Sequence, residues 1–266
     1  MNAKMLSSLE LMRFGRSMKS ALLVLPLSWR VSHYVVFLVF LLFSFAFNDL
    51  VDREMDKDGH PERPLPSGRI SAMEAGTISL CLLFAGVCFA YVWAEDLLKL
   101  FVCASGVSAV YSWILKRHVP LIATPLWALT VTTIVCLPAK ITVTGWLVFF
   151  LVLYIHEVLL DMRDVEADRI HCSTPSIATL LGKYCWWYVL FLLLTFSSVF
   201  ELGYAMEIAA GSVETFLWST LIQNAMVVFF LLMLYEIFMS DEEQTDWVAM
   251  GIKNLKRILP VSVLLV

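Results

Sequence analysis

Acidic side chains recur at helical spacing between Asn48 and Asp56. Asn48, Asp52 and Asp56 are each four residues apart, so on a helix they fall on one slowly drifting face. Like charges at this spacing repel one another by about a few tenths of a kcal/mol even in water. A cation is needed to offset them, and the segment therefore predicts a cation-binding helix end.

A second acidic series lies further along the chain. Glu157, Asp161, Asp164 and Asp168 stand at positions i, i+4, i+7 and i+11, which makes a narrow stripe on a helix. Mg²⁺ takes oxygen ligands and is usually held by a few carboxylates together with substrate phosphates. Two stripes facing each other across a cavity would hold Mg²⁺ ions that bridge a diphosphate and neutralise its charge as it leaves. The alternative for either series alone is a solvated charged loop at a helix end.

Basic residues accompany both acidic series. Those that could bind diphosphate oxygens are Arg63, Arg69, Lys116, Arg117 and Arg169. Arginine suits this task because its planar guanidinium makes bidentate contacts. The alternative is that these residues only set membrane topology. Tyr111 lies five residues before Lys116 at the same helix end, where it either reaches a cavity or serves as an interfacial aromatic.

The elements that must position these residues are membrane-spanning helices. Of the 266 residues, 60% are hydrophobic and only 16% are charged, with a mean hydropathy of +0.79. A soluble domain is about half apolar and a quarter charged, so this chain lacks the polar surface of a water-soluble particle. Apolar runs of about 18 to 25 residues recur, each long enough to cross a ~30 Å hydrocarbon core. The composition predicts a polytopic helical membrane protein, and no long basic run suggests a nucleic-acid partner.

The apolar runs define the expected spans. They are Ile70–Ala94, Leu97–Leu115, Val119–Ala139, Thr142–Leu160, Tyr184–Tyr204 and Phe216–Phe238, with a further run at Val35–Phe47 and a short closing run at Ile258–Val266. We expect residues 1–266 to form one integral membrane domain. Within it, residues 1–34 hold a short first helix, and whether that helix crosses the membrane stays open.

The distribution of charge predicts the orientation of the helices. Segments 48–69, 116–118 and 161–183 are rich in Lys and Arg, whereas the segments that alternate with them carry only Lys99 and Lys140. Positively charged loops stay on the cytoplasmic side of a membrane. Both acidic series and their basic neighbours are therefore expected to face the cytoplasm.

These motifs resemble those of a known family. Asn48–Asp56 resembles the first aspartate-rich motif, NDxxDxxxD, of the UbiA superfamily of intramembrane prenyltransferases, and His60–Ser71 is similar to the loop that follows it there. Tyr111–Arg117 resembles the family's segment from a tyrosine to a Lys/Arg pair, and Asp161–Arg169 looks like its second motif. The order and approximate spacing agree from about Phe43 to Gly182.

The resemblance implies an all-α bundle of about eight or nine transmembrane helices around a central cavity. It also implies transfer of a prenyl group from a prenyl diphosphate to an acceptor, commonly an aromatic ring, with Mg²⁺ as cofactor. The implied metal ligands are Asn48, Asp52, Asp56, Asp161, Asp164 and Asp168. The implied substrate-binding residues are Asn48, Lys116, Arg117, Arg63, Arg169 and Tyr111, and Asp52, Asp164 and Lys116 would be catalytic.

Two other functions are compatible with parts of this pattern. A terpene cyclase of the same superfamily would ionise the diphosphate in the same way but use an internal double bond as nucleophile, without an external acceptor. A transporter is the more remote alternative, since acids within a membrane also mark ion pathways. Here, however, the acids gather at one membrane face, with only His156 and Glu157 deeper. The sequence leaves the prenyl chain length, the acceptor and the oligomeric state open.

Overall fold

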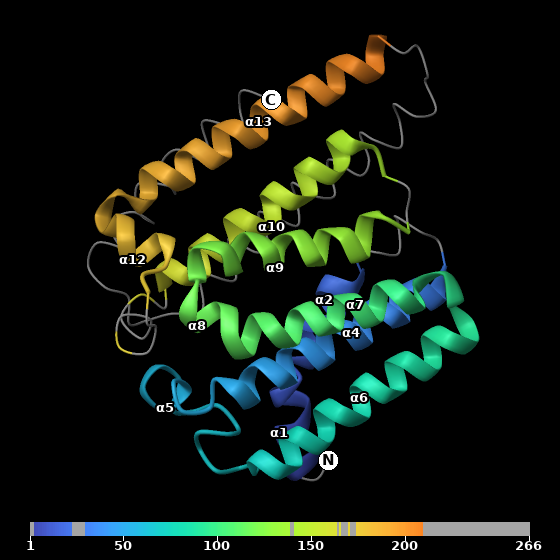
Figure 1. The fold of residues 1–266 in the computed structure, drawn as a ribbon, viewed down its shortest axis with the longest axis vertical. Coiled ribbons are helices and arrows are strands. Elements are labelled where there is room, and N and C mark those ends of the chain that lie inside the picture. Colours follow the sequence, from blue (N-terminus) through green and yellow to red (C-terminus); the bar gives the residue numbers. More distant parts are fainter. Residues whose placement is uncertain are drawn as a thin grey trace.

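The computed structural model describes residues 3–22, 30–138, 141–163, 165, 170 and 174–209. All regular secondary structure in these residues is helical (Figure 1). The first half of the described chain contains α1 (Ala3–Leu11), α2 (Phe14–Leu22), α4 (Val31–Val51), α5 (Asp56–Gly59) and α6 (Ala72–Trp93). The second half contains α7 (Glu95–Val110), a π-helical turn (Tyr111–Leu115), α8 (Lys116–His118), α9 (Pro120–Cys136), α10 (Val143–Arg163), α12 (Ile177–Leu181), a 3₁₀ turn (Gly182–Tyr184) and α13 (Cys185–Ala209).

The long helices confirm the apolar spans expected up to residue 204. The run from Val35 to Phe47 belongs to α4, which is longer at both ends. The other expected spans in this part of the chain correspond to α6, to α7 with the π-helical turn, and to α9, α10 and α13. The expected runs at 216–238 and 258–266 lie outside the described residues.

Four helical segments are long and apolar enough to cross a membrane within the described part of the chain. They are Val31–Val51, Ala72–Trp93, Glu95–His118 and Val143–Met162. At most half of each most apolar window is buried inside the protein. Large apolar side chains such as Phe84 and Trp113 are exposed on the outside of the bundle. A surface of this kind suits lipid, since soluble proteins rarely expose apolar patches of that extent.

The long helices lie side by side in a continuous series. Figure 1 shows them from α6 at the bottom through α4, α7, α9 and α10 to α13 at the top, and successive members of this series pack against one another. Chain direction alternates through short turns, so the end of α4, the end of α7 with α8, and the end of α10 meet at one end of the bundle. The same end contains α5 and α12, on the left of Figure 1.

Local sequence signals account for two of the helix boundaries at this end. Ser71 caps α6: its side chain accepts a hydrogen bond from the Glu74 backbone, and the Glu74 carboxylate accepts one from the Ser71 backbone. Pro120 occupies the first turn of α9, where its missing N–H would have no helical partner in any case. These two signals set the first residues of α6 and α9, the helices that lead the chain away from this end of the bundle.

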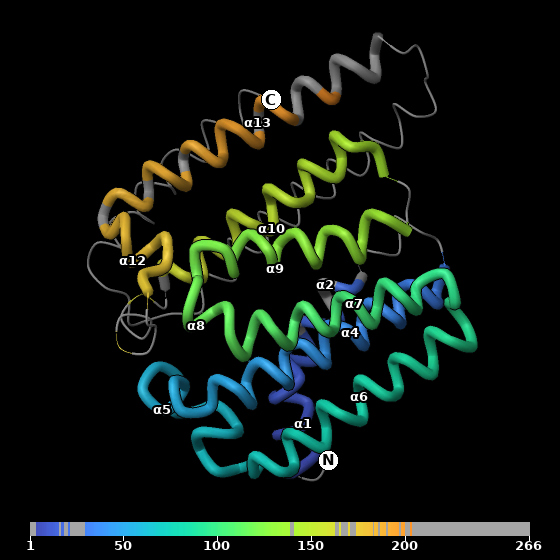
Figure 2. Tube along the Cα trace, in the orientation of Figure 1, coloured from blue at the N-terminus to red at the C-terminus, as the bar shows by residue number. Residues whose placement is uncertain are grey.

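The N-terminal helices α1 and α2 pack against the first two long helices rather than extending the series (Figure 2). Leu11 is fully buried in a small cluster with Ala46, Ile70 and Ala75. Neither α1 nor α2 is by itself long enough to span a bilayer, since a span needs about 20 residues and each has 9. Whether the first segment crosses the membrane stays a prediction, because residues 23–29 lie outside the described part of the chain.

Candidate active site

The centre of the candidate site is a buried carboxylate at the end of α4. Asp52 caps α4 and is only 2% exposed. Lys116 Nζ donates to Asp52 Oδ2 at 2.6 Å, and Asn48 Nδ2 donates to the same oxygen at 2.9 Å. The negative end of the α4 dipole disfavours an acid here, so the ammonium group supplies the charge that a buried carboxylate requires.

A second basic residue and a hydroxyl complete this cluster. Arg117 Nη2 donates to the Val51 carbonyl at 2.6 Å and lies 3.8 Å from Asp52 Oδ1. Ser112 Oγ donates to Asn48 Oδ1 at 3.2 Å. The predicted residues Asn48, Asp52, Lys116 and Arg117 are therefore brought together, and Ser112 holds the Asn48 amide in the orientation that faces Asp52.

A π-helical turn between α7 and α8 places the basic residues. Within Tyr111–Leu115 the hydrogen bonds run from residue i+5 to residue i, and the Lys116 N–H donates to the Tyr111 carbonyl. Such single wide turns inside α-helices are frequent at functional sites. Tyr111 and Lys116 thereby stand one wide turn apart, with Lys116 at Asp52 and Tyr111 stacked against Trp127, ring centroids 5.3 Å apart.

Asp56 follows Asp52 by one helical turn, with its N–H donating to the Asp52 carbonyl at 2.8 Å, but it has a different basic partner. The regular part of α4 ends at Val51, and Asp56 begins the short helix α5. Its carboxylate accepts a hydrogen bond from Arg63 Nη1 at 2.7 Å. Arg63 Nη1 also lies 3.9 Å from Asp49 Oδ1, and Arg13 Nη2 donates to that same oxygen at 2.6 Å. These four side chains thus form a series of contacts in which negative and positive charges alternate.

Burial disfavours the charged form of the Asp56 carboxyl group. Desolvation raises the pKa of its carboxyl group above the ordinary value, an effect that the guanidinium of Arg63 partly offsets. The negative charges of Asp49 and Asp52 raise this pKa further. A bound cation would favour the ionised form of this carboxylate.

Only part of the second acidic series lies among the residues that the structure describes. Asp161 Oδ2 accepts a hydrogen bond from Thr124 Oγ1 of α9 at 2.9 Å, and His156 Nδ1 lies 3.3 Å from Glu157 Oε1. Both acids lie on α10, which ends at the same end of the bundle as α4. The predicted positions Asp164, Asp168 and Arg169 lie outside the described residues and side chains.

Arg69 is placed away from both clusters. Its guanidinium makes a bidentate ion pair with Glu10 of α1, with N–O distances of 2.6 and 2.9 Å, and donates to the Glu62 carbonyl. Arg69 and Glu10 are both exposed. The idea that Arg69 could bind diphosphate is therefore not supported by its position, and the residue instead joins α1 to the loop before α6.

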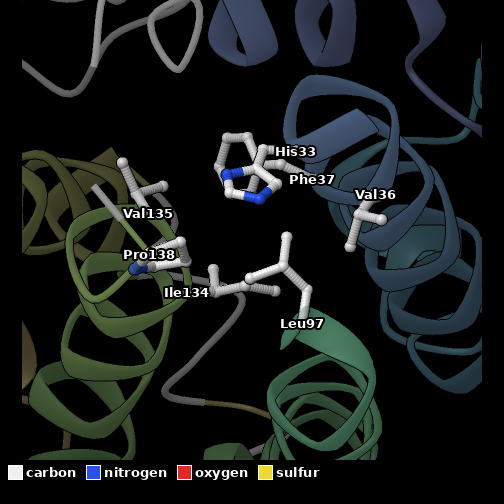
Figure 3. A pocket seen from close by; sticks show the side chains of 7 residues that line it. All are labelled: His33, Val36, Phe37, Leu97, Ile134, Val135 and Pro138. Atoms are coloured by element: carbon white, nitrogen blue, oxygen red, sulfur yellow. The ribbon is translucent and has the colours of Figure 1, made fainter. Parts of the chain in front are cut away.

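Stacked aromatic rings lead from the polar end into the bundle. Trp127 of α9 stacks with Tyr111 on one side and with Phe40 of α4 on the other, at 5.3 and 6.0 Å between centroids. Phe40 in turn stacks with Phe37 at 6.2 Å. Beyond Phe37 lies a small cavity, shown in Figure 3, which is lined by His33, Val36, Phe37, Leu97, Ile134, Val135 and Pro138.

The oxygen atoms of the first acidic series suit a hard cation. Asp52 Oδ1 and Asp56 Oδ2 are buried and have no hydrogen-bond partner, an arrangement that is costly unless a ligand compensates it. Among the described residues no three His, Cys, Asp or Glu side chains are grouped closely enough to hold a metal by themselves. Mg²⁺ does not need such a cage, since it keeps several waters and often uses one or two carboxylates plus phosphate oxygens. The residues present therefore fit Mg²⁺.

Several site residues could not be found from the sequence alone. Arg13, Ser112, Thr124 and Trp127 carry no motif of their own, and their roles follow from contacts between helices far apart in sequence. Arg13 and Asp49, for example, are 36 positions apart. The one signal available was that a buried acid needs a basic partner, and this signal does not identify the partner.

Fold and site together define an all-helical membrane protein with acidic and basic side chains gathered at one end of an apolar bundle. A family model, the UbiA prenyltransferase family, matches residues 21–257. The chain belongs to this family, which confirms the resemblance seen in the motifs, and it is an integral membrane protein.

Relatives and solved structures agree with this placement. A digeranylgeranylglyceryl phosphate synthase of Methanopyrus kandleri is 33% identical over 46% of this chain and 47% of its own length. A 4-hydroxybenzoate octaprenyltransferase of Vibrio vulnificus is 28% identical over 83% of this chain and 84% of its own. The matches to synthases of the first kind span only about half of their length, from 47 to 59% in three of them.

The fold has a counterpart among solved structures. A UbiA homologue from Archaeoglobus fulgidus, solved with GPP and Mg²⁺ bound, superposes with a TM-score of 0.66 at 17% identity, covering 93% of this chain and 97% of that one. At this level of identity the likeness establishes the fold of this chain. It does not establish which ligands this chain binds.

Proposed function

We propose that this protein transfers a prenyl group from a prenyl diphosphate to a lipophilic acceptor within the membrane, with Mg²⁺ as cofactor. The observation that carries the proposal is the Asn48–Asp52–Lys116 cluster at the polar end of an apolar bundle. It combines a buried carboxylate oxygen that lacks a hydrogen bond with an ammonium group 2.6 Å from the other oxygen. Family membership supports the same reaction class.

In this proposal, the two acidic series hold Mg²⁺ and the basic residues bind the diphosphate. The metal-binding residues are Asn48, Asp52, Asp56, Asp161, Asp164 and Asp168, and the diphosphate-binding residues are Lys116, Arg117, Arg63 and Arg169. Bound Mg²⁺ would neutralise charge on the departing diphosphate. Lys116 has three N–H donors, so it can contact a phosphate oxygen as well as Asp52. The homologue solved with GPP and Mg²⁺ supports the binding of a prenyl diphosphate together with Mg²⁺ in this fold.

The stacked rings supply a path for the hydrocarbon tail. Tyr111, Trp127 and Phe40 form a stack that starts beside the polar end and continues into the apolar interior. Aromatic faces attract cations within about 6 Å of the ring centroid, so these rings can stabilise an allylic cation. The apolar side chains around them exclude water, which would otherwise capture that cation.

The acceptor is inferred only as a class. One relative is named for 4-hydroxybenzoate, an aromatic molecule, and another for a glyceryl phosphate. Each name also contains an isoprenoid, octaprenyl in the first and digeranylgeranyl in the second. We therefore infer a small lipophilic or aromatic acceptor for this chain, bound near the polar end of the bundle.

Product analysis tests the proposal. Purified protein is incubated with geranyl, farnesyl and geranylgeranyl diphosphate, each with and without 4-hydroxybenzoate or a glyceryl phosphate lipid, and with Mg²⁺ or EDTA. We expect an acceptor-dependent, Mg²⁺-dependent prenylated product from at least one combination. Hydrocarbon or alcohol products that form without acceptor would replace the transferase by a terpene cyclase. Failure to consume any diphosphate in the presence of Mg²⁺ would contradict both.

A further inference from the structure

The alternating charges that end at Asp56 begin outside the predicted motifs, at Arg13. Arg13 Nη2 donates to Asp49 Oδ1 at 2.6 Å, and Asp49 is 3% exposed. The guanidinium also lies over the Phe45 ring, 5.2 Å from its centroid. One arginine from the N-terminal helices thus reaches the last two turns of α4, where the first acidic series starts.

The backbone at Arg13 is held in an unusual conformation. Among the described residues, Arg13 is the one non-glycine residue with positive φ, at 44°. A bulky side chain in this region is costly and persists only when its surroundings fix it. The strained residue forms the break between α1 and α2, so the chain direction changes at the point where the guanidinium meets Asp49.

Asp49 and Asp56 compete for the guanidinium of Arg63. This competition links the contact between Arg13 and Asp49 to the proposed site. Arg63 Nη1 lies between two carboxylates, 2.7 Å from Asp56 Oδ1 and 3.9 Å from Asp49 Oδ1. Arg13 neutralises Asp49, so Arg63 contacts Asp56 at the shorter distance. Without Arg13, Asp49 would be a buried carboxylate 3.9 Å from Arg63 Nη1, and it would attract Arg63 away from Asp56.

We propose that Arg13 is a positioning residue for the first acidic series. By satisfying Asp49 it keeps Arg63 paired with Asp56, and Asp49 itself is not a ligand of metal or diphosphate. The inference rests on the proposed function, because it assigns Asp56 and Arg63 to the metal and diphosphate site. Groups that orient the ligands of a metal typically change its affinity by about 10- to 100-fold when they are removed.

The test measures binding of geranyl diphosphate with Mg²⁺ to the full-length protein by titration calorimetry, without turnover of an acceptor. We expect Arg13→Gln to weaken binding by about tenfold or more, and Arg13→Lys, which keeps the charge, to recover part of the loss. Asp49→Asn should stay within about threefold of the wild type, since it removes the competing carboxylate. The double variant Arg13→Gln/Asp49→Asn should recover most of the binding for the same reason.

Two controls separate this role from general stability. Glu10→Gln breaks the exposed Glu10–Arg69 pair of the same N-terminal helices and should leave the affinity unchanged. Thermal unfolding in the absence of Mg²⁺ shows whether each variant folds. The inference is overturned if Arg13→Gln binds like the wild type, if Glu10→Gln loses as much affinity, or if Asp49→Asn alone loses tenfold. A wild-type protein that does not bind geranyl diphosphate would instead refute the proposed function.

Discussion

At the scale of single residues, the proposed chemistry depends on Asp52, whose side chain is held by an ammonium group and an amide. Replacing it with Asn keeps the size and removes the charge that Lys116 and a metal ion require. We expect Asp52→Asn to lower Mg²⁺-dependent consumption of prenyl diphosphate by at least about 100-fold, in the range found for loss of one preorganised electrostatic contact. The measurement is the initial rate of diphosphate release.

Asp58 offers a matched control for this change. It is an acid of the neighbouring short helix α5 but is exposed. Asp58→Asn should retain turnover within about twofold, because removing an exposed charge changes the local field little. An Asp52→Asn variant that folds, inserts and keeps near-normal turnover would show that the carboxylate is not part of the machinery.

A second prediction at this scale concerns Trp127. The ring lies between those of Tyr111 and Phe40, so Trp127→Ala removes the centre of the stack. We expect a 10- to 30-fold lower turnover, since a desolvated cation–π contact is worth about 2 kcal/mol. Trp127→Phe should retain most of the rate. Trp93 is exposed to lipid at the opposite end of the bundle, and an equal loss in Trp93→Ala would rule out a specific role for Trp127.

At the scale of elements, the π-helical turn sets the direction of Lys116. Deleting Ile114 would convert the wide turn into an ordinary one and rotate the residues after it by about 100°. Lys116 and Arg117 would then leave Asp52, and we expect turnover to be abolished while the protein still inserts into membranes. Ile114→Ala, which truncates an exposed side chain without changing the register, should be nearly neutral. Membrane fractionation and diphosphate release measure the two effects.

The packing of α6 against α7 gives a stability prediction. Gly86 faces the Phe101 ring so closely that a Cβ at this position would overlap it. Gly86→Ala should therefore destabilise the fold by about 1–3 kcal/mol, the usual cost of overpacking, and lower the thermal midpoint in detergent. Gly106 of α7 has no neighbour within 4 Å of its Cβ position, so Gly106→Ala should not lower it. Equal shifts in both variants would contradict the packing argument.

Element positions were the part of the structure that the sequence predicted best. Runs of apolar residues long enough to span a membrane leave few alternatives to a helix, and charge or proline marks their ends, as at Asp52 and Pro120. The pairing of Asn48 with Asp52 also followed from helical spacing. The partner of Asp56 did not, because helical spacing does not predict contacts with the loop that follows α4. The regular part of α4 stops at Val51, and Arg63 from the following loop provides a local partner for Asp56.

At the scale of the whole molecule, both described acidic clusters lie at one end of the bundle, and the distribution of basic residues predicts that this end faces the cytoplasm. In a variant without native cysteines, Lys57→Cys and Lys99→Cys introduce exposed thiols at opposite ends. We expect a membrane-impermeant maleimide to label Lys99→Cys in intact cells, and Lys57→Cys only after permeabilisation. The opposite labelling pattern would invert the orientation inferred from the positive-inside rule.

The contacts of the N-terminal helices also bear on the order in which this protein assembles. Lys4 pairs with Glu74, Glu10 with Arg69, and Arg13 with Asp49. All these residues precede position 75, so they are synthesised before Lys116 and their contacts do not require it. The first acidic series can then be oriented by the N-terminal helices without its ammonium partner. Within this series, the pair between Lys116 and Asp52 would thus complete the assembly rather than begin it.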